Sequence, residues 1–190
     1  MEEYIKIIDG GTTFGVGFFV GNLFITAGHI FESGSNHSIS HRGKKIPLNK
    51  ADALFYCPVV NYDFKTDGYD LAIFQCGEIN SPLELATENI FIGQTLQNMT
   101  IRNVNSNAST SSIFDQHISI EAYKCTAEVT NSNGFFGECN THMILKEGDS
   151  GSPFFKDNKV FGFLVAGEPD TPRVIFQTAR SVNQIILQIQ

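Results

Sequence analysis

One serine in this sequence has surroundings that suit a nucleophile. Ser150 lies in residues 147–153, EGDSGSP, close to Gly148 and Gly151. Glycines allow the tight turn that exposes a hydroxyl and leaves backbone N–H groups unhindered beside it, as an oxyanion site requires. A serine hydroxyl is inert until a neighbouring base removes its proton. The segment therefore predicts acyl chemistry only if the chain also supplies a base.

A histidine and an aspartate that could complete such a site each adjoin an apolar run. His29 closes residues 23–29, LFITAGH, and Asp70 opens residues 70–74, DLAIF. Short runs of β-branched and aromatic residues predict buried strands, so we expect both side chains to be held at strand ends. The three residues then follow one another in the order His, Asp, Ser.

Each of these residues also has an ordinary structural interpretation. His29 could stand at the edge of the core, Asp70 in a turn or cap, and Ser150 in a loop. Asp63 and Asp67 are rival carboxylates, but neither precedes an apolar strand, and each is more simply placed in a solvated turn. Because all three motifs occur together, each attached to a predicted strand, the sequence favours the catalytic interpretation.

The elements that must position these residues are predicted to be strands almost throughout. The runs rich in β-branched or aromatic residues are 16–19, 23–26, 53–56, 71–75, 100–104, 118–123, 126–130, 160–165 and 174–177. Turn residues separate them, which is typical of antiparallel sandwiches and barrels. One helix is predicted at residues 181–190, capped by Ser181 and apolar on one face. Residues 105–112, NSNASTSS, are predicted to form a polar surface loop.

Composition excludes several classes of protein. The chain has 190 residues, 42% of them hydrophobic and 17% charged, which argues against a disordered tail, a coiled coil or a collagen-like repeat. The net charge is −7, and the 13 Lys and Arg residues are spread thinly, so we expect no binding to nucleic acid or to a membrane surface. Proteins or peptides remain as the expected partners, with the oligomeric state open.

The N-terminal residues predict the compartment. Residues 1–8, MEEYIKII, open with acids and lack the basic segment and long apolar run of a secretory signal. The chain also lacks an apolar stretch of about 18 residues that could span a membrane. We therefore expect a cytoplasmic protein, in the host-cell cytoplasm if the source is a virus.

The four cysteines give no sign of a metal site. Cys57, Cys76, Cys125 and Cys139 lie far apart and form no C-x-x-C pair, which argues against zinc binding and against a thioredoxin motif. Without a secretory signal we expect them to be reduced and buried, although disulfides stay open if a leader has been lost. The sequence supports neither a metal nor an organic cofactor.

At these motifs the sequence resembles the chymotrypsin-like (trypsin-fold) serine peptidases. The resemblance rests on residues 17–29, 69–74, 148–153 and 161–167, which read GFFVGNLFITAGH, YDLAIF, GDSGSP and FGFLVAG. It implies an all-β fold of two antiparallel six-stranded β-barrels with a short C-terminal helix. Residues 1–82 would form the first barrel, and residues 83–190 the second barrel and the helix, in one peptidase unit.

The resemblance also implies a role for each site residue. His29 would act as general base and then general acid, Asp70 would hold its tautomer, and Ser150 would form the acyl-enzyme of a serine endopeptidase. The backbone N–H groups of Gly148 and Ser150 would form the oxyanion hole. A catalytically silent homologue that binds peptides or acts as a scaffold is the alternative, and a non-peptidic acyl hydrolase is a second one.

Two substrate preferences follow from the resemblance and both stay open. Arg173 would point into the base of the specificity pocket and favour an acidic residue through a charge-assisted pair, unless a shortened loop turns it to solvent. The remaining residues implied for the pocket would make it an apolar slot: Ile144, Leu145, Leu164, Val165 and Gly167.

The sequence departs from the secreted family members at two places. Those members pair a newly formed N-terminus with the aspartate before the nucleophile, here Asp149, but too few residues separate Ile8 from His29 for such activation. Asp149 must then find another partner or point to solvent. The family's cystine beside the catalytic histidine is also missing, since Ile30 follows His29. Both departures point to the compact bacterial, HtrA-like or viral branches.

Overall fold

The computed structural model describes residues 1–11, 14–33, 36–58, 68–103 and 120–190. These ranges contain three short 3₁₀ helices, Glu2–Tyr4, Gly28–Glu32 and Lys50–Asp52, and the α-helix α1, Ala179–Ile189. The strands are β1 Ile5–Asp9, β2 Phe14–Val20, β3 Leu23–Thr26, β4 His37–His41, β5 Lys44–Leu48, β6 Phe55–Cys57, β7 Leu71–Gln75, β8 Glu84–Leu85, β9 Thr95–Asn103, β10 Ile120–Ser132, β11 Phe136–Thr141, β12 Pro153–Lys156, β13 Lys159–Gly167 and β14 Arg173–Thr178.

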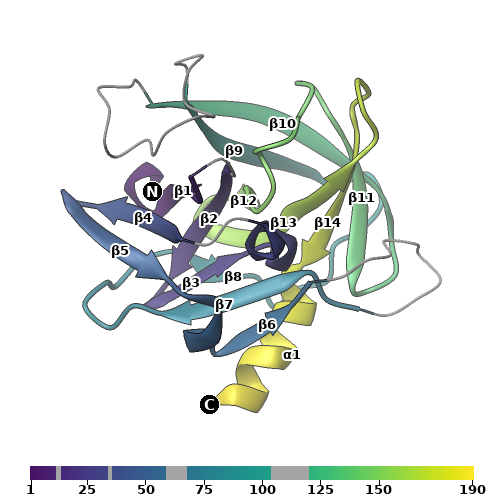
Figure 1. Cartoon of the computed structure of the whole chain (residues 1–190). Helices are drawn as coiled ribbons and strands as arrows, with labels where there is room; N and C mark the ends of the chain where they lie inside the picture. Colours follow the sequence, from purple (N-terminus) through teal and green to yellow (C-terminus); the bar gives the residue numbers. More distant parts are fainter. Residues whose placement is uncertain (12–13, 34–35, 59–67, 104–119) are drawn as a thin grey trace.

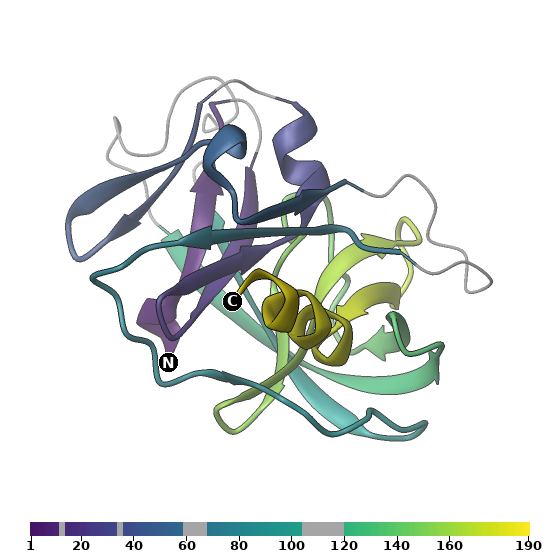
Figure 2. The ribbon, with the colours of Figure 1, turned by 90° about the horizontal axis from the view of Figure 1, so that it is seen from below.

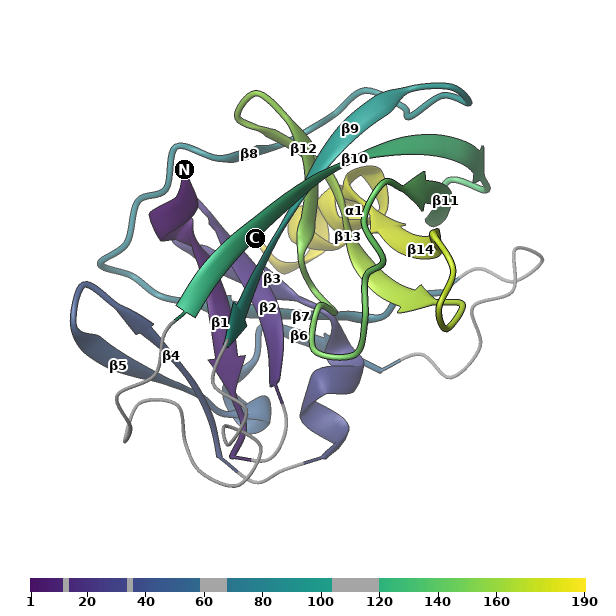
Figure 3. The same ribbon diagram turned by 90° about the horizontal axis from the view of Figure 1, so that it is seen from above.

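The strands form two sheets that divide the chain in sequence order. The first sheet has the order β5-β4-β1-β2-β3-β7-β6, and the second β12-β9-β10-β11-β14-β13-β8. In Figure 1 the first sheet occupies the left and lower side and the second the upper right, and Figure 3 shows the same division from above. The all-β architecture with a terminal helix is therefore confirmed.

The two sheets close to different degrees. In the second sheet β12 pairs with both β9 and β13, which completes a ring of six strands, β9 to β14. The two-residue strand β8 adds to this ring by a parallel pairing with β13. In the first sheet β5 and β6 stand at opposite ends of the strand order, and no pairing joins them within the described residues. Each sheet thus has seven described strands where six were expected. A short strand is added at one end of each, the three-residue β6 in the first sheet and the two-residue β8 in the second.

Every run predicted as a strand overlaps one in the structure. Residues 118–123 and 126–130, predicted as separate strands, belong to the single long strand β10. Six strands were not predicted, namely β1, β4, β5, β8, β11 and β12. Asp63, Asp67 and the loop at residues 105–112 lie outside the described residues.

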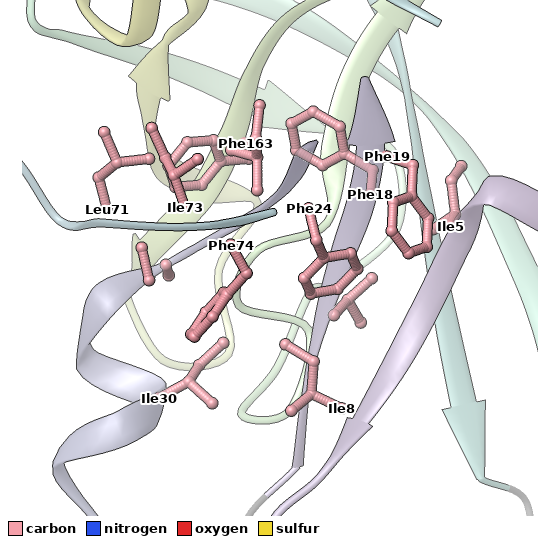
Figure 4. Packing of buried hydrophobic residues seen from close by; sticks show 14 of the residues in the cluster. Ile5, Ile8, Phe18, Phe19, Phe24, Ile30, Leu71, Ile73, Phe74 and Phe163 are labelled. Carbon is pink, nitrogen blue, oxygen red and sulfur yellow. The ribbon is translucent and has the colours of Figure 1, made fainter. Parts of the chain in front are cut away.

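Phenylalanine fills the core that joins the two sheets. The sequence has 17 Phe and no Trp, and eight of the largest fully buried side chains are Phe. Phe163 of β13 lies among residues of the first sheet, beside Leu71 and Ile73 (Figure 4), with its ring centroid 6.2 Å from that of Phe18. Aromatic burial of this size is a major source of stability, so the core favours the docking of one sheet on the other.

The C-terminal helix begins earlier than the sequence predicted. Thr178 caps α1, because its side chain accepts a hydrogen bond from the backbone N–H of Ser181. Ser181 is therefore not the cap. It lies buried in the first turn, where its hydroxyl donates to the carbonyl of Thr178. Val182 and Ile185 are buried, and Figure 2 shows α1 lying across the underside of the molecule.

Candidate active site

Three side chains from distant segments meet between the two sheets. His29 lies in the 3₁₀ helix after β3, Asp70 directly before β7, and Ser150 in the loop before β12. His29 Nδ1 is 2.6 Å from Asp70 Oδ2, and His29 Nε2 is 3.1 Å from Ser150 Oγ. The backbone N–H of His29 also donates to Asp70 Oδ1 at 2.8 Å. A carboxylate, an imidazole and a hydroxyl in series can move a proton from the hydroxyl to the ring.

The charge of Asp70 determines the basicity of His29. Burial by itself lowers the pKa of the His29 imidazole, but the hydrogen bond and the charge of Asp70, helped by Glu32, outweigh burial and raise the pKa above 6.5. The Asp70 carboxylate is fully buried, whereas the His29 side chain is 30% exposed. The ring is thus held in contact with a desolvated negative charge on one side and open to substrate on the other.

A glutamine that the sequence did not single out holds the backbone of Asp70. The N–H of Asp70 donates to Gln177 Oε1 at 2.8 Å, across from the second sheet. Gln177 is fully buried, and its Nε2 donates to the carbonyls of Gly68 and Phe135 and to Ser181 Oγ. One amide therefore joins the segment before β7 to β14 and α1. The only sequence signal was a polar residue at the end of an apolar run.

The turn at Ser150 depends on Gly151. Its φ of +91° lies in the left-handed region, and an added Cβ would stand 1.8 Å from the carbonyl oxygen of Val16. This close approach lets the N–H of Val16 donate to the carbonyl of Ser150 at 2.8 Å, while the N–H of Gly151 donates to Leu164. Both sheets therefore hold the turn, and only glycine fits there.

The loop also leaves donors free beside the hydroxyl. Gly148 has a φ of +98°. Within the described part of the chain, the N–H groups of Gly148 and Ser150 make no hydrogen bond. Both are therefore unpaired donors in the loop that carries Ser150.

Asp149 has an internal partner, Arg102. Asp149 is 1% exposed, and Arg102 binds it through both Nη2 to Oδ2 at 2.6 Å and Nε to Oδ1 at 3.0 Å. The hydroxyl of Thr100 and the N–H of Lys146 donate to the same carboxylate. The guanidinium lies 5.0 Å from the ring centroid of Tyr123, and its hydrogen bond to Asp149 raises the Arg102 pKa. Strand β9 thereby holds the loop that carries Ser150, a link that the sequence did not reveal.

A cavity of about 350 Å³ opens beside Ser150. Four of the six residues expected in the specificity pocket line it: Ile144, Leu145, Leu164 and Gly167. Ala166 and Val174 also line it, as do Lys146, Glu147, Glu168, Pro169 and Asp170. The wall is therefore apolar, and three carboxylates and one ammonium group stand around it.

Two residues expected in the pocket lie elsewhere. Val165 does not line the cavity, because its side chain is 2% exposed and buried in the core that joins the two sheets. Arg173 does not line the cavity. Its guanidinium pairs with Glu138 of the neighbouring strand β11, and its side chain is 59% exposed.

The remaining expectations concern metals, cysteines and membranes. Among the described residues, no group of three or more His, Cys, Asp or Glu side chains could hold a metal ion. The four cysteines are free thiols, and burial raises the pKa of Cys139 most strongly. No described helix has the length and apolar character needed to cross a bilayer.

The sequence of the chain matches a known protein family. The family model described as Trypsin matches residues 4–186. No curated protein sequence matches the chain.

Solved structures show the same architecture at low sequence identity. The active form of the Rv3671c protease from M. tuberculosis is 16% identical, with a TM-score of 0.67 over 99% of this chain and 81% of that one. Neuropsin, a serine protease of mouse brain, is 13% identical, with a TM-score of 0.71 over 98% and 93%. The serine protease of a human pathogenic astrovirus is 16% identical, with a TM-score of 0.60 over 94% and 90%. The expected chymotrypsin-like fold is confirmed.

Proposed function

The chain belongs to the trypsin family and is a chymotrypsin-like serine peptidase, and we propose that it cleaves internal peptide bonds through His29, Asp70 and Ser150. The observation that carries the proposal is the unbroken series of contacts from Asp70 Oδ2 to His29 Nδ1 and from His29 Nε2 to Ser150 Oγ. Residues 1–82 supply the base and the carboxylate, and residues 83–190 supply the nucleophile, so that neither part is active alone.

Each step of the reaction uses an atom of this site. His29 Nε2 takes the proton of Ser150 Oγ as the oxygen attacks the substrate carbonyl, and the N–H groups of Gly148 and Ser150 bind the oxyanion that forms. His29 then gives the proton to the leaving amine, which releases the first product. Water, activated by His29, hydrolyses the ester on Ser150 and restores the hydroxyl. Asp70 stays ionised and stabilises the imidazolium in both steps.

We propose an apolar preference for the residue before the scissile bond. Ile144, Leu164 and Val174 line the cavity beside Ser150, and a side chain placed there would bury apolar surface. The acidic preference has less support, because Glu138 already pairs with Arg173 and because Glu168 and Asp170 would repel a carboxylate.

Labelling with a fluorophosphonate tests the mechanism, because only an activated serine reacts with it. The wild-type protein should be labelled at Ser150 and Ser150→Ala should not. Ser152→Ala is the matched control, since Ser152 is two residues away, fully buried and bonded to Asn98 instead of His29. A folded wild-type protein that stays unlabelled would favour the silent scaffold.

A peptide library tests the pocket. Peptides that differ only in Leu, Glu or Lys before the scissile bond should be cleaved fastest with Leu. Arg173→Gly should leave that order unchanged. A preference for Glu that disappears in Arg173→Gly would establish the acidic alternative. Ester and peptide substrates assayed side by side separate a peptidase from a general acyl hydrolase.

A further inference from the structure

A second cavity lies on the first sheet, and we propose that it binds an acidic peptide segment. Its volume is about 680 Å³, against about 350 Å³ for the cavity beside Ser150, and the two share no lining residue. It opens between the edge strand β5 and the segment that follows β7. Figures 1 and 3 show β5 and β14 at opposite sides of the molecule, so this cavity is remote from the proposed specificity pocket.

The rim of this cavity reverses the charge balance of the chain. The whole chain has 13 cationic and 20 acidic residues, yet Arg42, Lys44 and Lys45 face a single lining acid, Glu78. The β4–β5 hairpin gathers the three cations, because positive φ angles at Arg42 and Gly43 produce a two-residue turn. The sequence had suggested thinly spread cations. The fold concentrates three of them at one opening.

These cations are free to exchange partners. Arg42 pairs with Glu3 at 3.1 Å and Lys44 with Glu78 at 3.5 Å, and both pairs are largely exposed. Exposed ion pairs contribute little to stability, so an incoming carboxylate can displace them at small cost. Lys45 has no acidic partner among the described residues.

A buried histidine lies in the wall of this cavity. His41 is 8% exposed, lies between the rings of Tyr4 and Phe19, and has an Nδ1 atom without a hydrogen-bond partner. Burial and then the charges of Lys6 and Arg42 lower the pKa of His41, so the positive charge at this cavity comes from Arg42, Lys44 and Lys45 and not from the ring.

The other residues that line the cavity favour an acidic peptide over a small inorganic anion. Ile46, Pro47 and Ile79 give the cavity an apolar wall beside the cations, and its volume is far larger than an inorganic anion needs. A ligand that carries both carboxylates and apolar side chains fits this combination. Pairing with the edge of β5 adds little, because Pro47 has no N–H to donate. Three cations are also too few for the row of phosphate contacts through which proteins hold a nucleic acid.

The binding test does not rest on the catalytic proposal. It uses the Ser150→Ala protein, so that no peptide is cut, and a fluorescein-labelled decapeptide of alternating Glu and Leu, followed by fluorescence anisotropy. We expect saturable binding that weakens as salt is added. The double variant Lys44→Glu with Lys45→Glu should bind about tenfold more weakly or worse, and Glu78→Gln should bind more tightly.

A matched control separates this site from net charge. Lys124→Glu with Lys156→Glu changes the net charge equally at two exposed positions outside the cavity, and it should bind within about twofold of the parent. All four lysines are exposed, so circular dichroism should show folded variants. Equal weakening in both double variants, absence of saturable binding, or equal binding of a Lys-Leu decapeptide or a single-stranded oligonucleotide would overturn the proposal. Ser150 labelling in the wild-type protein would be unaffected by any of these results.

Discussion

The two sides of the proposed active site are held in place by different chemistry. On the nucleophile side, Asp149 next to Ser150 is bound by the charged Arg102 from β9 of the same sheet. On the base side, the backbone of Asp70 is bound by the neutral Gln177, which comes from the other sheet. The first support is an ion pair within one barrel, and the second is an amide that acts only when the two sheets are docked.

This difference has energetic consequences. Forming a buried ion pair requires both charges to lose their hydration. Removing one partner then leaves an uncompensated buried charge, which typically lowers the free energy of unfolding by about 3–5 kcal/mol. Removal of a neutral acceptor leaves one buried N–H unsatisfied, typically at about 1–3 kcal/mol. The nucleophile loop should therefore be more sensitive to a change in its support than the base is. The variants below test that contrast, beginning with the reacting groups themselves.

Loss of the nucleophile should have the largest effect. Ser150→Ala should reduce kcat for peptide hydrolysis by about 10⁶, because without Oγ no acyl-enzyme forms. Hydrolysis of a fluorogenic peptide measures the rate, and an unchanged melting temperature shows that the fold persists. Substantial residual cleavage by the pure variant would contradict the assignment of Ser150.

Loss of the Asp70 charge should be the next largest. Asp70→Asn keeps the size of the side chain but no longer accepts the proton of His29 Nδ1–H, so that the ring takes the wrong tautomer and kcat falls by about 10⁴. Glu32→Gln is the control, since Glu32 contributes to the His29 pKa only as a minor charge. If Asp70→Asn and Glu32→Gln had similar rates, Asp70 would not hold the tautomer.

Arg102→Met tests the charged support. It should lower the free energy of unfolding in urea by about 3 kcal/mol or more, because Asp149 stays buried without its cation. The double variant Arg102→Met with Asp149→Asn should recover part of this loss, since it removes the unpaired charge. Arg102→Lys should be intermediate, because an ammonium group lacks the two-donor fork. If Arg102→Met and the double variant were equally stable, the unpaired charge of Asp149 would not be the cause of the lost stability.

The sequence was sufficient to predict the three side chains that meet between the sheets, because each stands in a recognisable local pattern. Ser150 stands among glycines, and His29 and Asp70 adjoin apolar runs. Arg102 and Gln177 carry no such pattern, since their partners lie 47 and 107 residues away and become neighbours only in the folded chain. Local sequence predicts the three groups that meet at the site better than it predicts the groups that hold them in place.

The same limit applies to the strands and the pocket. Strands β4 and β5, HSISH and KKIPL, mix polar and apolar residues and include a proline, so they lack the apolar runs that predicted β3 and β7. Arg173 was placed in the pocket by resemblance alone, and the partner that binds it, Glu138, lies on a strand that was not predicted.

Gln177→Leu tests the neutral support, and its effect should be smaller. Without Oε1 the N–H of Asp70 is left unsatisfied, and at the low end of that cost, about 1 kcal/mol, kcat should fall about fivefold while KM changes little. Ser181→Ala is the matched control, because it removes a partner of Gln177 but leaves the contact with Asp70. Equal losses of kcat in both variants would mean that Gln177 acts through packing and not through Asp70.

The smallest expected effect is a shift in the pH profile of wild-type activity, caused by the raised pKa of His29. The His29 pKa is raised above 6.5 chiefly by Asp70, against burial, and the ring must be neutral to accept the Ser150 proton. The acid limb of kcat/KM should therefore lie above pH 6.5, and activity should fall as pH decreases through it.

Stability should change in the opposite sense. Because the pKa of His29 is higher in the folded than in the unfolded protein, its contribution to stability is complete below the unfolded pKa and is lost as pH rises through the folded pKa. Conditions that protonate His29 should thus strengthen its pair with Asp70 while they stop catalysis. Asp70→Asn should move the limb to lower pH and remove this contribution to stability, and a limb at the same pH in both proteins would show that another group controls it.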